Sequence, residues 1–400
     1  MTHRAFASLC SVSILLPRPR GIVYDPGMLL HRLPVLFGAL ALAACIPEVS
    51  AQAPLPPHPA TYAQGQLHRG INAGNALDAP KEGEWGVTLD ERFFADVAAA
   101  GFDHVRIPVR FNAHAAAAAP YTVDEDFFRR VDWAIEQTTS RKMTAILDFH
   151  HYTELMDDPD GHAARFVGIW RQIAARYRDR PASLVHELLN EPTGKLTAPK
   201  WNALLVTALA AVREVDPTRK VIVDSVFWAA AKELANLELP AGDPHLIASF
   251  HMYQPILFTH QGMPFMTAEY GTTGIPFPGP AAAPIAPVPE ALKVDWVADW
   301  FRRYNSTPAA ENPGGPAAVL AEFAMARAFA ERTKRELYMG EFGTGDVIDP
   351  ASRARWTRLV REEAERHGMG WAYWDDGGRF KVHDRKTGAW DPELTAALLR

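Results

Sequence analysis

Two glutamates, Glu191 and Glu341, are the residues of this chain that point most directly to chemistry. Each lies at the end of a short apolar run, "SLVHELLNEP" for the first and "RELYMGEFG" for the second. A carboxylate at the end of a buried strand is poorly solvated and is directed out of the sheet edge. Two such carboxylates facing one cleft can act as the acid and the nucleophile of glycoside hydrolysis. The pair predicts this chemistry if the fold brings the two strand ends together.

The elements that would position these glutamates are strand-like and helix-like segments, which alternate from about residue 66 onward. Eight continuous apolar runs are typical of buried parallel strands, and residues at helical spacing, such as Trp201, Leu205 and Val212, follow them. This order predicts an α/β protein: a single (β/α)8 TIM barrel with its active site at the C-terminal ends of the strands. Such a barrel brings distant strand ends to one rim.

Length and composition agree with one barrel plus additional segments. The chain has 400 residues, 48% of them hydrophobic, whereas a barrel typically needs about 250 residues. The formal net charge of −6 comes without a long basic run, so nucleic-acid binding gains no support. The proline-rich segment 254–290 is too long for an ordinary loop, and we expect it to set substrate specificity.

The N-terminal part predicts export. We interpret residues 1–27 as an upstream extension outside the functional protein, 28–51 as a signal, 52–65 as a linker and 66–400 as the catalytic domain. The signal has basic residues after Met28 and then an apolar run that is too short for a comfortable membrane span. We therefore expect a secreted or periplasmic protein.

Two processing routes remain open. "LAAC" resembles a bacterial lipoprotein box in which Cys45 would carry lipid, whereas cleavage after Ala51 would release a soluble protein. Cys10 and Cys45 are the only cysteines, and both precede the predicted catalytic domain, so a disulfide scaffold is excluded.

Other polar and aromatic residues gather at the predicted strand ends, where barrel active sites are built. Within the fourth strand, either His186 or Glu187 must face the barrel interior, as part of a buried polar network. Besides the two glutamates, the candidate site residues are Asn75, Arg106, His150, Asn190, His251, Tyr253 and Trp374.

The ordered motifs "RGINAGNALDAP", "VRIPVRF", "ILDFHHY", "ELLNEP", "FHMYQP", "MGEFGT" and "WAYWDDGG" resemble glycoside hydrolase family 5, the cellulase-type retaining barrel enzymes. The resemblance covers about residues 66–376. It implies that Glu191, in the NEP motif, is the acid/base and that Glu341, in the GEF motif, is the nucleophile. Their closeness would favour a protonated Glu191 in the free enzyme.

The other candidates suit supporting roles around this pair. Arg106 can hold Glu341 ionised by charge pairing, and Tyr253 can donate a hydrogen bond to the same carboxylate. His251 can orient Glu191 or tune its proton affinity.

The remaining candidates suit contacts with sugars. Asn190 fits the 2-hydroxyl of the sugar beside the scissile bond, and His150 can bond another hydroxyl. Trp374 offers a ring face on which a pyranose can stack, and Asn75 can contact a more distant sugar.

Metal binding is not expected. Adjacent residues of a strand, such as His150 and His151, point to opposite faces, and no spacing supplies a third ligand. Asp157, Asp158 and Asp160 lack the late glutamate of a calcium loop, and we expect Asp160 to cap the following helix.

The resemblance implies a retaining endo-β-1,4-glucanase of the cellulase type, without a cofactor. A β-mannanase, a xyloglucanase or a mixed-linkage β-glucanase would use the same catalytic pair. A catalytically silent carbohydrate-binding barrel and a metal-dependent hydrolase are more remote alternatives. We expect a monomer that acts on a β-linked polysaccharide and contacts a membrane only through lipid at Cys45.

Overall fold

In a computed structural model that describes residues 66–400, eight parallel strands close into one barrel. Each strand pairs with the next in sequence, and β8 pairs with β1. The predicted (β/α)8 fold is therefore confirmed. The predictions for residues 1–65, Cys45 included, lie outside the described residues. The strands are β1 (Arg69–Asn72), β2 (His104–Val109), β3 (Thr144–Phe149), β4 (Leu184–Glu187), β5 (Val221–Asp224), β6 (Leu246–Met252), β7 (Glu336–Phe342) and β8 (Gly370–Tyr373).

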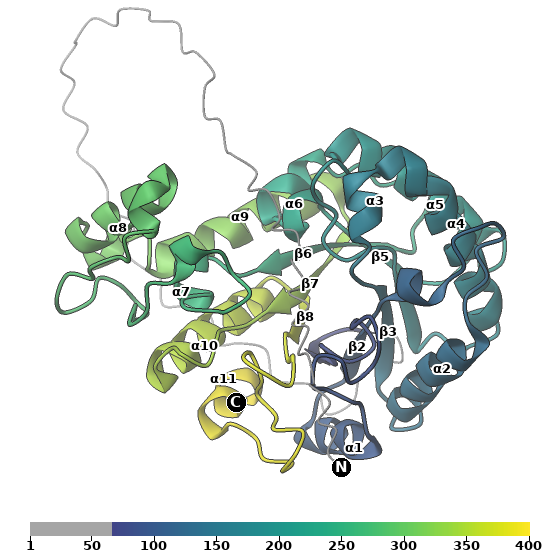
Figure 1. Cartoon of the computed structure of the whole chain (residues 1–400), viewed down its shortest axis with the longest axis horizontal. Helices are drawn as coiled ribbons and strands as arrows, with labels where there is room; N and C mark the ends of the chain where they lie inside the picture. Colours follow the sequence, from purple (N-terminus) through teal and green to yellow (C-terminus); the bar gives the residue numbers. More distant parts are fainter. Residues whose placement is uncertain (1–65) are drawn as a thin grey trace, which may run out of the picture. The chain divides into compact units, whose positions relative to one another are not determined.

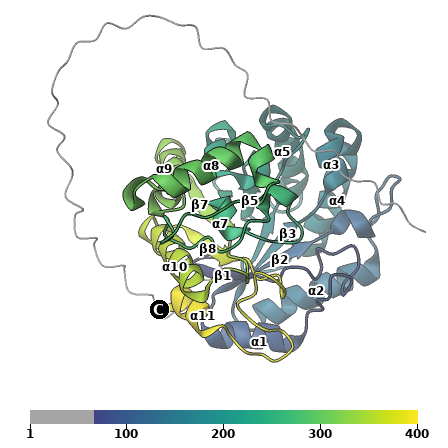
Figure 2. The ribbon, with the colours of Figure 1, turned by 60° about the vertical axis from the view of Figure 1, so that its left-hand side comes forward.

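Helices surround this barrel, and Figure 1 shows the strands in the centre of their ring. Figure 2 shows α10, α11 and α1 following one another along one side. Within residues 66–400, every helix is too short or too polar to cross a bilayer. The helices are α1 (Glu91–Ala100), α2 (Glu125–Thr139), α3 (Thr153–Asp157), α4 (Pro159–Tyr177), α5 (Ala198–Arg213), α6 (Val226–Ala229), α7 (Ile256–Thr259), α8 (Asp295–Ser306), α9 (Pro316–Thr333), α10 (Pro350–Arg366) and α11 (Pro392–Leu399).

Aspartates start several of these helices by accepting main-chain N–H groups of the first turn. The expectation that Asp160 caps a helix is wrong, because Asp158 accepts from the N–H of Gly161 and Asp160 lies inside the first turn of α4. Proline at position 159 favours the earlier start, since its fixed φ suits the first helical residue. The capping aspartates are Asp90, Asp124, Asp158, Asp349 and Asp391.

Two connections depart from regular strand–helix alternation. Between β5 and β6 the chain forms only α6 and the 3-10 segment Ala231–Asn236. Between β6 and α9 lies a long insertion, residues 253–315, which contains α7, α8 and the 3-10 segments Ala268–Tyr270, Ala291–Lys293 and Ala309–Glu311. The predicted long loop is thus a folded segment.

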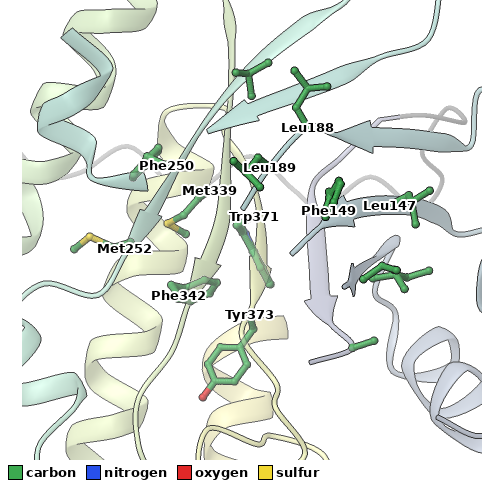
Figure 3. Close-up of a cluster of buried hydrophobic side chains, with 14 of the residues drawn as sticks. Leu147, Phe149, Leu188, Leu189, Phe250, Met252, Met339, Phe342, Trp371 and Tyr373 are labelled. Atoms are coloured by element: carbon green, nitrogen blue, oxygen red, sulfur yellow. The ribbon is translucent and has the colours of Figure 1, made fainter. Parts of the chain in front are cut away.

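Apolar side chains on the outer face of the strands form the main core against the helices. These side chains recur at every second residue of a strand, as the pleat requires. Figure 3 shows part of this core, with Leu147 and Phe149 from β3, Phe250 and Met252 from β6, and Trp371 and Tyr373 from β8.

The barrel interior is divided into two layers. A separate apolar cluster fills the N-terminal end of the barrel with Leu67, Ile146, Val185, Ile222, Ile247, Tyr338 and Ala372. Two residues further along the same strand faces, the inward side chains become polar. This upper layer contains Asn72, Arg106, Asp148, Glu187, Asp224 and Ser249, all of them fully buried. Glu187 is therefore the residue of β4 that faces the interior, whereas His186 packs against the ring of Trp170 in α4.

Candidate active site

A β-bulge in β7 brings Glu341 over the barrel. The pairing of β6 with β7 runs from Phe250 opposite Met339 to His251 opposite Glu341, so Gly340 has no partner in the register. A Cβ at Gly340 would lie 2.8 Å from Nε2 of His251, which is too close for any larger residue without movement. Glycine at this position therefore lets His251 and Glu341 stand side by side.

Arg106, fully buried on β2, organises the polar layer beneath the two glutamates. Its Nη1 donates to Oε1 of Glu341 at 2.8 Å and to Oδ1 of Asn72 at 2.9 Å. Nε and Nη2 donate to the two carboxylate oxygens of Glu187 at 2.8 and 2.7 Å. Nη2 also donates to Oδ1 of Asn190 at 2.7 Å. The guanidinium of Arg106 thus connects β2 by hydrogen bonds to residues in or just after β1, β4 and β7.

Glu191 approaches from the loop after β4, and its main chain has a left-handed φ of 50°. Its carboxylate Oε1 lies 2.8 Å from Nδ1 of His251, and the same ring nitrogen is 3.6 Å from Oε2 of Glu341. The carboxylate oxygens of Glu191 and Glu341 that face each other lie within 4.8 Å. The side chain of Glu191 is 24% exposed and that of Glu341 is 6% exposed. The fold therefore brings both carboxylates, distant in sequence, to the mouth of the barrel.

Burial and charge give Glu341 the properties of an anion. Burial alone raises the pKa of Glu341, but the positive charges of His251 and Arg106 outweigh burial and lower it. The phenol of Tyr253 donates to Oε2 of Glu341 at 2.9 Å, which favours the ionised form further. Burial and the charge of Glu341 raise the pKa of Tyr253, so this donor keeps its proton.

His251 is a buried cation between the carboxylates. Burial lowers the pKa of His251, but the charges of Glu341 and Asp224 more than compensate and raise it to about 9. At neutral pH the imidazole is therefore protonated and donates from Nδ1 towards Glu191.

His150 and Trp374 form a second part of the rim. Nδ1 of His150 lies 2.5 Å from Oδ2 of Asp148, a carboxylate 3.1 Å from Nη2 of Arg106. Burial and the neighbouring His151 lower the pKa of His150, which keeps its ring neutral. The ring stacks on that of Trp374, with 5.7 Å between centroids and an angle of 6°. The Trp374 ring also passes close to Gly74, where a Cβ would lie 2.9 Å from the ring.

Asn75 lies further out, in the loop after β1, and takes no part in the hydrogen bonds that join the two glutamates. Its main-chain N–H donates to Oδ2 of Asp78 at 3.1 Å, and this carboxylate is 3.9 Å from Nε2 of His151. Trp85 packs its ring edgewise against His151, with 5.6 Å between centroids. Contacts thus join the loop after β1 to His151, which follows β3.

Several aromatic residues in the connections that follow β5 and β6 were not predicted as site residues. Phe227, Trp228 and Ala229 in α6 all have a left-handed φ, and Trp228 is 51% exposed. Phe265, in the insertion, is 62% exposed and packs on Phe380. The sequence gives no periodic signal for Trp228 or Phe265, because each lies in an irregular part of the chain.

A ring contact path links Phe265 to the nucleophile candidate. The ring of Phe380 lies 6.2 Å from Phe265 and 6.2 Å from Tyr253, between centroids. His260 contacts all three rings. The insertion therefore reaches the rim beside Tyr253.

In two of the groups with metal-ligand geometry among the described residues, carboxylate oxygens already have other partners. Arg106 and Tyr253 donate to the two oxygens of Glu341. The oxygens of Asp78, near His150 and His151, accept main-chain N–H groups of Asn75 and Ala76. Absence of a metal requirement stays a prediction.

A barrel of this topology with two carboxyl groups at its mouth is compatible with a glycoside hydrolase, and comparison with known proteins gives the family. Residues 69–379 match the family described as "Cellulase (glycosyl hydrolase family 5)". The chain belongs to glycosyl hydrolase family 5.

Two of the curated relatives are named endoglucanases. Endoglucanase H of Acetivibrio thermocellus is 29% identical over 339 residues, 83% of this chain and 33% of that protein. This chain thus spans about a third of the length of Endoglucanase H. Endoglucanase C of the same organism is 27% identical over 299 residues, 72% of this chain and 83% of that protein.

Solved structures share the fold at higher identity. Cel5A of Thermotoga maritima in complex with mannotriose is 35% identical, with a TM-score of 0.72 over 84% of this chain and 98% of that chain. The cellulose synthase subunit Z of Clostridioides difficile is 31% identical, with a TM-score of 0.73 over 84% of this chain and 100% of that chain.

Proposed function

We propose that the protein is a retaining endo-β-1,4-glucanase in which Glu341 is the nucleophile and Glu191 the acid/base. The single observation that carries this proposal is the approach of their carboxylate oxygens to within 4.8 Å. Retaining glycosidases have their carboxyl groups about 5–5.5 Å apart, whereas inverting enzymes leave room for a water at about 6.5–9.5 Å. The separation therefore supports double displacement.

In the first step, a carboxylate oxygen of Glu341 bonds to the anomeric carbon while the glycosidic bond breaks. The departing oxygen takes the proton of Glu191, which leaves a glycosyl ester on Glu341. In the second step, Glu191 takes a proton from water as the water oxygen bonds to the anomeric carbon and Glu341 leaves as a carboxylate.

The contacts around the pair support distinct roles for its neighbours. Arg106 and Tyr253 hold Glu341 ionised and fix its orientation, so that one oxygen can attack. His251 holds Glu191 toward the scissile bond.

Four residues are proposed to contact sugar. Arg106 engages the amide oxygen of Asn190, which leaves its NH2 group available for the 2-hydroxyl of the sugar. Trp374 offers its ring to the sugar, His150 a neutral ring nitrogen, and Asn75 a contact further out.

The named activities of the relatives support a β-1,4-glucan as substrate. A β-mannanase is the second candidate, because Cel5A of Thermotoga maritima has been solved with mannotriose as well as with cellobiose. Initial rates on barley glucan, carboxymethylcellulose, xyloglucan and mannan rank these substrates directly. A mannan rate above all glucan rates would reverse the choice.

Variants of the two glutamates test the mechanism. Glu341→Ala should abolish turnover of every glycan, whereas Glu336→Ala, at the exposed start of the same strand, should leave it unchanged. Glu191→Ala should slow natural glycans severely but spare aryl glycosides with very good leaving groups, which need no proton. Equal losses on both substrate classes would contradict the acid/base role.

Two further parts of the proposal have their own tests. Activity should persist after exhaustive chelation, and a loss restored by a divalent cation would favour a metal-dependent hydrolase. We also propose export, either with lipid on Cys45 or as a soluble form. Metabolic fatty-acid labelling of wild type and Cys45→Ala decides between these two forms.

A further inference from the structure

Asp224, the last residue of β5, is a fully buried acid that the mechanism above does not use. Its Oδ2 accepts the main-chain N–H of Glu191 at 3.0 Å and lies 3.6 Å from Nε2 of His251. Its own carbonyl accepts from Nε1 of Trp201, in α5, at 2.9 Å. Asp224 is therefore fixed to the barrel wall and contacts both the acid/base candidate and the histidine beside it.

The first contact restrains a strained main chain. Glu191 has a φ of 50°, and a non-glycine residue in this region costs on the order of 1–3 kcal/mol unless its surroundings hold it there. The main-chain N–H of Glu191 points at the carboxylate of Asp224. Loss of this acceptor would let the main chain relax and move the carboxyl group away from the scissile bond.

The second contact acts through charge. Nε2 of His251 and Oδ1 of Asp224 have no hydrogen-bond partner within residues 66–400, and their side chains face each other at a distance too long for a hydrogen bond. His251 also faces Glu191, from the loop after β4, and Glu341, from β7.

Further charges surround this pair. The positive charge of His251 contributes to the lowered pKa of His150, which follows β3. Burial and the charge of Glu187 raise the pKa of Asp224 to about 7, while the charges of His251 and Arg106 oppose this rise. Asp148 is a further buried acid in this layer, and burial raises its pKa well above the ordinary value.

We propose that Asp224 is a positioning residue that holds Glu191 by its main-chain amide and keeps His251 cationic beneath it. This inference rests on the proposed role of Glu191. The two actions can be separated, because asparagine keeps an oxygen that can accept the Glu191 N–H but lacks the charge, whereas alanine removes both.

The first experiment compares Asp224→Ala, Asp224→Asn and Glu191→Ala on cellotetraose and on a dinitrophenyl β-cellobioside. A displaced general acid costs on the order of 100-fold in rate, so Asp224→Ala should lose 10- to 100-fold in kcat on cellotetraose. It should lose less than threefold on the aryl glycoside, with KM little changed. Asp224→Asn should recover most of the cellotetraose rate.

Each other outcome has a defined meaning. Equal losses on both substrates, or equal losses for alanine and asparagine, would overturn the main-chain role of Asp224. If Glu191→Ala itself lacks the leaving-group pattern, the proposed function has failed, and not the role of Asp224.

The second experiment follows the titration of His251 by NMR of histidine-labelled protein, with His251→Gln to assign its signal. Because the carboxylate raises the pKa of His251, Asp224→Asn should lower it by at least one unit. An unchanged pKa would overturn the charge role. Because it uses Asp224→Asn, this measurement tests the charge role of Asp224 even if Asp224→Ala does not fold.

Discussion

At the scale of single residues, the layer of charges under the two glutamates explains how one carboxyl group is kept ionised inside a barrel. Arg106 has all five N–H bonds engaged, and four of its partners come from other strands or their ends. Such a cluster is costly to desolvate, and its geometry matters more than its charge count. The ionisation of Glu341 therefore depends on individual donors.

Removal of the Tyr253 phenol tests this dependence. The Tyr253 donor lowers the pKa of Glu341, so Tyr253→Phe should raise that pKa. The acidic limb of the kcat/KM profile, on which Glu341 becomes protonated, should then move to higher pH. We expect a fall in kcat of about 10- to 100-fold, which corresponds to the roughly 1.5–3 kcal/mol that a hydrogen bond to a charged group contributes. A pH profile of wild type and variant on one aryl glycoside measures both effects, and an unmoved acidic limb would contradict the assigned contact.

Sequence made the two catalytic candidates predictable, together with Arg106, Tyr253 and His251 beside them, but not the buried acids Asp148 and Asp224 in the layer below. Glu191 and Glu341 follow apolar runs, which place them at strand ends. Asp224 also ends such a run, "KVIVD", and the same rule could have selected it. Asp148 lies two residues before His150, so the period of a strand could have placed both on one face. Which of these acids meet, however, depends on contacts between strands that no single segment encodes.

At the scale of elements, the bulge in β7 is the feature that the strand pattern could not reveal. "ELYMGEF" reads as one uninterrupted apolar strand, and a shift of one residue would turn Glu341 away from the interior. The glycine at position 340 is compatible with a bulge, yet it is equally common where backbones approach closely.

Gly340→Ala should separate the two neighbours that the bulge brings together. The added methyl group meets His251, and overpacking of this kind costs about 1–3 kcal/mol. We expect a lower thermal midpoint and a loss of activity larger than the loss of stability explains. Gly242→Ala is the matched control, because a Cβ there has no neighbour within 4 Å. Equal thermal midpoints and equal activities of the two variants would show that the close approach of Gly340 to His251 is unimportant.

The insertion after β6 is the element from which we expect substrate specificity. The length and prolines of residues 254–290 predicted an unusual segment, but not the short helix α7 nor the position of Phe265 beside Phe380. An exposed ring in a turn carries no periodicity, so only the structure places it at the rim.

Phe265→Ala should weaken the binding of long glycans. Loss of one aromatic stacking contact is worth roughly 0.5–1.5 kcal/mol, which corresponds to about a 2- to 12-fold rise in KM. We expect this rise on polysaccharide, with little change in kcat on a short aryl cellobioside. Leu292→Ala, an equally exposed apolar residue of the same insertion, is the control. A KM that does not change on any glycan would exclude Phe265 from binding.

At the scale of the whole molecule, the fold was the most predictable property. Eight apolar strands leave few alternatives to a closed parallel barrel, and a closed barrel fixes which strand ends share a rim. The connection from β5 to β6 has no long helix, a local exception that does not alter the topology.

Residues 66–400 should act without the preceding part of the chain. All candidate site residues and the whole barrel lie within this range. A protein that begins at residue 66 should therefore keep the kcat of the longer chain and a thermal midpoint within a few degrees. Calorimetry and initial rates on one soluble glucan compare the two proteins. A large loss of either property would mean that residues 1–65 contribute to the catalytic unit.

The apolar cluster at the N-terminal end of the barrel has one more consequence. It closes the interior from below, so water has no route to the glycosyl ester except the open mouth. Under double displacement, the incoming molecule must use the space that the departed sugar has just vacated. A second carbohydrate alcohol, abundant and well bound there, would compete with water for the ester, and longer chains would then be built alongside those that are cut.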